Sequence, residues 1–75
     1  MKLLFVSRHA LLRVRQRKIG LEEVKSAIEK PDLKAFVRRG RLKVIRRVRN
    51  RDLIVVYRSA RHVDIVVTAY WRKTC

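Results

Sequence analysis

Acidic residues are scarce in this chain: 6 Asp and Glu stand against 21 Lys and Arg in 75 residues, which gives a formal net charge of +15 at pH 7. Charge networks that stabilise proteins against heat need acidic partners for the basic groups, and these acids are too few. A surplus of one sign destabilises the folded state by self-repulsion, so it is typical of surfaces that carry a polyanion. The composition therefore favours a role of the positive charge in binding nucleic acid over a role in solubility alone.

Cysteine and proline occur once each, and glycine twice. Cys75 has no second cysteine in the chain to pair with, which fits a reducing cytoplasm, and its oxidation would join two chains. No stretch is rich in Pro, Gly or Ser, so we expect a single domain over residues 1–75. The apolar run Leu3–Val6 is too short for a signal peptide or a membrane span. We therefore expect a soluble, cytoplasmic protein that has no membrane partner.

The usual spacings of a metal or cofactor site are missing as well. The two histidines lie far apart in the sequence, no Gly-rich phosphate loop is present, and the acids do not cluster as the ligands of hard metal ions do. We therefore expect neither a metal nor a cofactor.

The first half of the chain carries apolar residues at helical spacing. Ser7 is placed to cap a helix over residues 8–17. A second helix is expected to begin at Leu21 and to stop at Pro31. Residues 2–6 are either a short strand or an extended lead-in. Two helices with a short break between them predict a helical hairpin.

Beyond the proline the hydrophobic period changes from 3.6 to 2, and the residue types shift to β-branched and aromatic. This pattern predicts four strands, at residues 33–39, 42–49, 53–59 and 62–70. The segments between them are short enough for hairpins, so we expect an antiparallel meander. The third strand is apolar on both faces, which predicts a central position in the sheet.

Alternation in the last predicted strand assigns its side chains to two faces. One face is expected to carry Val63, Ile65, Val67 and Ala69, and the other His62, Asp64, Val66, Thr68 and Tyr70. One of these faces then meets the helices and the other meets water. The expected fold class is therefore α+β, with an N-terminal helical hairpin packed on a four-stranded antiparallel sheet.

Basic residues concentrate in the second predicted strand and its flanking turns. Arg outnumbers Lys there, and its planar guanidinium suits bidentate phosphate contacts and stacking on bases. The candidates for binding nucleic acid are Arg17, Arg38, Arg39, Arg41, Lys43, Arg46, Arg47, Arg49 and Thr68. Trp71 is a ring that stacks on a base or covers an interface, or else a ring at the edge of the core.

Another group of residues suits RNA cleavage without a metal. That reaction needs a base for the 2′-hydroxyl, an acid for the leaving 5′-oxygen and cations for the pentacovalent phosphate. His9 is the natural titrating group, Arg13 and Arg17 follow it at intervals of one helical turn, and Tyr70 offers a proton or a stacking surface. The alternatives are a locally hydrogen-bonded His9, a solvated basic stripe and a Tyr70 ring in the core.

Several short motifs, taken in order, resemble a family of small uncharacterised prokaryotic domains. The stretch Ser7–Arg13 reads Ser-x-His-Ala-x-x-Arg, and Leu53–Tyr57 and Ile65–Tyr70 resemble the family's closing segments. That family is similar to the RelE-like toxins of toxin–antitoxin operons. The resemblance implies two helices on an antiparallel sheet and, in active members, metal-independent cleavage of RNA on the ribosome. The residues that match its opening and closing motifs are His9, Arg13, Thr68 and Tyr70.

Three functions follow as hypotheses. The first is a RelE-like toxin or metal-independent ribonuclease that acts on RNA or on the ribosome, with His9, Arg13 and Tyr70 as catalytic residues. The alternative is a non-catalytic, basic nucleic-acid-binding module. Both hypotheses predict RNA binding, so a measurement of RNA turnover distinguishes them. The third is an interaction domain for a small acidic protein such as a cognate antitoxin. His62 with Asp64 is a second candidate pair, which cross-strand packing explains equally well.

Overall fold

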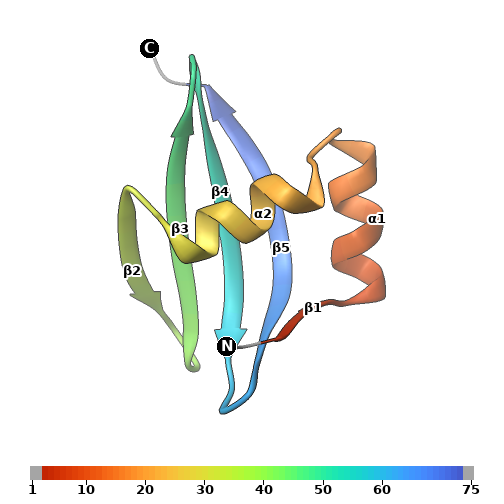
Figure 1. Cartoon of the computed structure of the whole chain (residues 1–75), viewed down its shortest axis with the longest axis vertical. Helices are drawn as coiled ribbons and strands as arrows, with labels where there is room; N and C mark the ends of the chain where they lie inside the picture. Colours follow the sequence, from red (N-terminus) through yellow and green to blue (C-terminus); the bar gives the residue numbers. More distant parts are fainter. Residues whose placement is uncertain (1–2, 74–75) are drawn as a thin grey trace.

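A computed structural model describes residues 3–73 as two helices and one five-stranded sheet (Figure 1). In chain order the elements are β1 (Leu3–Val6), α1 (Arg8–Gln16), α2 (Leu21–Glu29), β2 (Leu33–Val37), β3 (Arg41–Val48), β4 (Arg51–Ser59) and β5 (Val63–Lys73). The strand order across the sheet is β1-β5-β4-β3-β2. β4 is therefore the central strand. In keeping with this position, its apolar residues are buried on both of its faces.

The expected four-stranded antiparallel sheet is wrong, because a fifth strand makes the sheet mixed. β2 to β5 pair antiparallel in sequence order, close to the four expected ranges. β1 adds to β5 in parallel, with Leu3 beside Val63 and Val6 beside Val66. Four residues are too few to display a period of 2, and a pairing between the two ends of the described chain leaves no local turn signal.

The expected helical hairpin is also wrong, because the two helices pack on different parts of the sheet. α1 lies beside β5 at one edge, whereas α2 crosses β4 and β3 (Figure 1). Each helix buries its own small apolar stripe against the strands, Ala10 with Val14 in α1 and Val24 with Ala27 in α2. Helical periodicity identifies such stripes, but it does not say whether a helix or a strand will cover them.

A β-bulge breaks the expected alternation of β5. Ala69 lies opposite Val55 and is buried, but the register then shifts between Val56 and Tyr57, so that Val66 is buried as well. The extra residue in β5 is Val67. Val63 and Ile65 therefore point away from the helices, contrary to the alternation expected for this strand.

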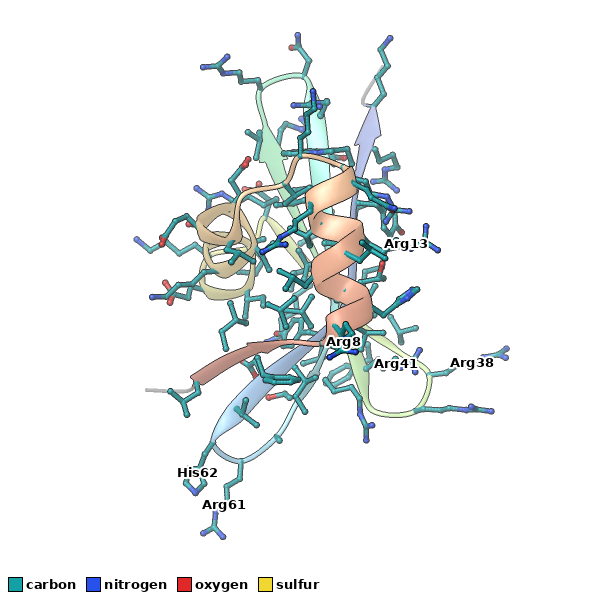
Figure 2. The ribbon with its side chains drawn as sticks, turned by 90° about the vertical axis from the view of Figure 1, so that its right-hand side faces the viewer. Arg8, Arg13, Arg38, Arg41, Arg61 and His62 are labelled. Carbon is teal, nitrogen blue, oxygen red and sulfur yellow. The ribbon has the colours of Figure 1, made fainter. Side chains whose placement is uncertain are left out.

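One face of the sheet is covered by both helices and the other is open. The core on the covered face consists of Ala10, Val14, Ile19, Val24, Ala27, Leu42, Val44, Leu53, Val55, Tyr57, Val66 and Ala69. Figure 2 looks at the sheet edge beside α1; there α2 lies on one side, and Arg38 and Arg41 project on the other. We call that other side the open face. Successive side chains of a strand point to opposite faces of the sheet. Each candidate site residue on β3, β4 or β5 therefore lies either on the open face or on the covered face.

Candidate nucleic-acid interface

The open face carries a group of basic side chains on its three central strands. Cross-strand register aligns them on alternate positions of β3, β4 and β5. They are Arg41, Lys43, Arg47, Arg58 and Arg72. The three on β3 belong to the set expected from the sequence. Arg58 and Arg72 were missed, and the signal that finds them is the continuation of the same alternation into β4 and β5.

Two of these cations are direct cross-strand neighbours. Arg41 on β3 lies opposite Arg58 on β4, and both side chains are exposed. Like charges in directly opposed positions destabilise a sheet. Within residues 3–73 neither guanidinium forms an ion pair with a carboxylate. The arrangement leaves this part of the open face with positive charge that an external anion would neutralise.

Asp52 organises the two other guanidiniums at the far end of the open face. Its side chain is only 6% exposed, and its carboxylate accepts from Nε of Arg47 at 3.4 Å and from Nη2 of Arg72 at 3.3 Å. The two arginine side chains remain 68% and 53% exposed. Asp52 therefore holds both guanidiniums in place while their outer edges stay in solvent. Asp52 falls between the second and third predicted strands, where a turn is expected, so the alternation of the strands does not reveal it.

Tyr70 and Thr68 lie on the open face between these cations. Tyr70 is opposite Ile54 and Thr68 is opposite Val56, on the side of β4 away from the helices. Both side chains are half-buried. Arg72 follows Tyr70 on the same face of β5, and an aromatic ring beside an arginine on an uncovered sheet is a surface that suits stacking by single-stranded bases.

The short motif at the start of α1 divides into structural and exposed residues. Ser7 caps the helix, because its Oγ accepts from the backbone N–H of Ala10 at 3.2 Å and donates to the backbone oxygen of Val66 at 3.4 Å. Ala10 is fully buried against the sheet. His9 and Arg13 are exposed, and Figure 2 shows Arg13 leaving α1 on the side where Arg41 projects. The helix thus borders the open face along β5.

The chain matches the family described as Domain of unknown function (DUF4258) over residues 6–71. It belongs to this family. No curated protein and no solved structure matches the DUF4258 domain of this chain. The expectation of a family of small uncharacterised domains is therefore confirmed, and the similarity to RelE-like toxins stays a prediction.

Two other basic candidates of this DUF4258 domain, Arg17 and Arg46, contact the backbone of the fold. Arg17 donates through Nη1 to the backbone oxygen of Ala69 at 2.8 Å, which ties the end of α1 to β5. Arg46 lies on the covered face and donates to the backbone oxygen of Lys30, at the end of α2. Both guanidiniums are thereby engaged with the fold's own backbone.

The turn residues separate to opposite ends of the domain. Arg38 and Arg39 lie in the turn from β2 to β3, whereas Arg49 lies in the turn from β3 to β4. Because β3 runs the length of the sheet between these turns, the two groups cannot contact one phosphate together (Figure 1). The basic residues between Arg38 and Arg49 are close in sequence, but the fold distributes them over both ends of β3 and both faces of the sheet.

The second candidate pair is also separated from α1. His62 is exposed in the turn from β4 to β5, beside Arg61 and well below Arg13 in Figure 2. Asp64 follows on β5, half-buried and engaged in an interaction of its own. Cys75 lies outside the described residues.

Two observations on residues 3–73 of the DUF4258 domain concern metal ions and membranes. Within residues 3–73, no three imidazole, thiol or carboxylate groups come together as a metal site would require. Neither helix in that range has the length and apolar character that a bilayer-spanning helix needs.

Proposed function

We propose that this DUF4258 domain binds single-stranded RNA along the open face of its sheet. The observation that carries the proposal is the direct opposition of Arg41 and Arg58, two exposed cations with no ion pair among the described carboxylates, on a face that neither helix covers. A phosphodiester backbone placed across them removes the repulsion and releases condensed counterions.

The open face offers the two kinds of contact that single strands use. Arg41, Lys43 and Arg58 supply phosphate contacts over β3 and β4. The ring of Tyr70 supplies a stacking surface that accepts any base, because every base has a π-face. This chemistry favours a single strand over a duplex, whose bases are already stacked.

A second candidate is cleavage of the bound strand without a metal, as in the RelE-like toxins that the motifs resemble. It is favoured by the packing of α1 against β5: the helix that bears His9 and Arg13 borders the strand that bears Tyr70. In this reaction His9 takes the 2′-hydroxyl proton, Arg13 stabilises the charged phosphate and Tyr70 protonates the leaving 5′-oxygen. The ribosome is the substrate carrier that the resemblance implies, and a small acidic antitoxin would compete with RNA for the open face.

RNA binding is tested by fluorescence anisotropy with a labelled single strand over a range of salt. The double variant Arg41→Gln/Lys43→Gln removes two charges from the open face, and the matched variant Lys25→Gln/Lys30→Gln removes two from exposed positions at α2. Each phosphate contact contributes about 0.7 to the slope of log K against log salt for single strands. We expect the open-face variant to lower that slope by about 1.4 and the α2 variant to leave it unchanged. Equal losses in the two variants would remove the open face as the binding site.

Cleavage is tested on free mRNA and on translating ribosomes with a chelator present. We expect His9→Ala and Tyr70→Phe to abolish the cut while RNA binding persists, since Tyr70→Phe keeps the stacking ring. Cleavage that survives in both variants would refute this assignment of roles. Binding without cleavage in the parent protein leaves the non-catalytic module as the function.

A further inference from the structure

A hollow of about 770 Å³ lies at the end of the sheet where β3 turns into β4. Its walls come from α2, from the turn and from the end of β5. The lining residues are Glu23, Val48, Arg49, Asn50, Arg51, Trp71 and Lys73. Val48 and Trp71 pack against the core of the covered face, so the hollow is separate from the open face. Its size falls within the range of small-molecule sites, about 300–1,000 Å³.

Trp71 gives this hollow a fixed aromatic wall. Its Nε1–H donates to the backbone oxygen of Arg17 at 3.1 Å, which holds the indole in one orientation. The guanidinium of Arg51 lies over the ring, 4.2 Å from its centroid. A guanidinium has two faces, and the one turned away from the indole is a surface on which a nucleobase stacks.

Two further cations line the hollow beside this stacked pair. They are Arg49 and Lys73, and among the described lining residues Glu23 supplies the one carboxylate. Glu23 Oε1 already accepts from the backbone N–H of Gly20 at 3.1 Å, as part of the N-terminal cap of α2. The remaining positive charge suits an anionic ligand.

The backbone places Arg49 at the tip of the turn between β3 and β4. Its φ is 60°, a left-handed conformation that short hairpin turns commonly use and that Lys18 and Arg39 also adopt. This turn brings the side chain of Arg49 to the edge of the hollow.

We infer that this hollow binds a nucleotide, with its base stacked on the Arg51–Trp71 pair and its phosphate held by Arg49 and Lys73. An apolar aromatic wall with cations at its rim matches a ligand that combines a planar ring with an anion. The inference does not depend on RNA binding at the open face. A free mononucleotide and the terminal nucleotide of an RNA strand both carry a base and a phosphate, so both fit this inference.

The test uses the fluorescence of Trp71, which is the single tryptophan of the chain. Adenosine 5′-monophosphate is titrated into the full-length protein, with adenosine and inorganic phosphate as separate probes. We expect saturable quenching by the nucleotide and affinities at least about tenfold weaker for adenosine and for phosphate, because each makes only one of the two contacts. No saturable binding of the nucleotide, or equal affinity for inorganic phosphate, would overturn the inference.

Two variants, followed by calorimetry, assign the binding to this hollow. Arg49→Gly removes the guanidinium and relieves the left-handed backbone, so we expect about tenfold weaker nucleotide binding with a thermal midpoint no lower than that of the parent. Lys25→Gln, on exposed α2, removes the same charge and should leave the affinity unchanged. Equal weakening in both variants would mean a diffuse charge effect and would contradict the site.

Competition distinguishes the two sources of the nucleotide. A short RNA with a 5′-phosphate that displaces the mononucleotide better than its unphosphorylated form identifies a strand end as the ligand. Failure of both RNAs to displace it identifies a free nucleotide. Because the salt-slope experiment on Arg41 and Lys43 probes the other face, either proposal can fail while the other stands.

Discussion

At the residue scale, the motif Ser7–Arg13 combines two kinds of constraint. Ser7 and Ala10 hold α1 onto β5, one through a cap and a hydrogen bond to Val66 and the other through close packing. His9 and Arg13 do neither: both are exposed, and within residues 3–73 neither side chain forms a hydrogen bond or an ion pair. The local hydrogen bond that was the alternative for His9 is therefore not present among these residues.

This division predicts that two neighbouring substitutions change the free energy of unfolding by unequal amounts. Ser7→Ala removes the cap of α1 and should lower the free energy of unfolding by about 1 kcal/mol. His9→Ala alters an exposed side chain and should stay within about 0.5 kcal/mol of the parent. Denaturant unfolding followed by circular dichroism measures both. A cost for His9→Ala as large as that for Ser7→Ala would mean that the imidazole is structural.

At the element scale, the sequence predicts the helices and strands that depend on local periodicity, and it does not predict the features that depend on contacts between distant segments. The helices and the four strands β2–β5 follow their periodicity, because apolar spacing of 3.6 or 2 is fixed by backbone geometry. The parallel pairing of β1 and the bulge at Val67 depend on contacts between distant segments. The bulge decides which residues of β5 are buried, so alternation counted from Ala69 assigns Val63 and Ile65 to the wrong face.

The pairing of β1 predicts unequal roles for two adjacent leucines. Leu4 packs against the core, whereas Leu3 is 73% exposed on the other side of the strand. We expect Leu4→Ser to lower the free energy of unfolding by about 2 kcal/mol and Leu3→Ser to lower it by less than about 0.5 kcal/mol. Chemical denaturation of the two variants compares them directly. A larger cost for Leu3→Ser than for Leu4→Ser would contradict the register of β1, because a slip of one residue exchanges the two faces. Equal costs would contradict the unequal burial of the two leucines.

At the scale of the whole molecule, the candidate site was predicted in part. The basic second strand led to Arg41, Lys43 and Arg47 on the open face. It also led to Arg46, which period 2 places on the covered face. Arg58 was missed because it belongs to a strand expected to be apolar core, and Asp52 because it falls in the turn expected before that strand. A charge count favours a polyanionic partner as a hypothesis, but only cross-strand register shows which cations share a face.

Net charge predicts a response to salt that ion-paired proteins do not show. With +15 on 75 residues, screening should stabilise the fold, so raising monovalent salt from about 25 mM to about 500 mM should raise the thermal midpoint by about 5 °C. Arg58→Gln relieves the opposition to Arg41 and should raise the midpoint at low salt, with a smaller gain at high salt. Scanning calorimetry at the two salt concentrations measures both effects. A midpoint that falls with salt would mean that attractive pairs dominate the surface.

RNA binding on the open face is tested by mapping amide shifts by NMR as a short single-stranded RNA is added to the isotopically labelled protein. RNA on the open face should perturb β3, β4 and β5 around Arg41, Lys43, Arg58 and Tyr70, and should leave the exposed side of α2 around Lys25 unchanged. Perturbations confined to α2, or spread evenly over all basic residues, would contradict the account.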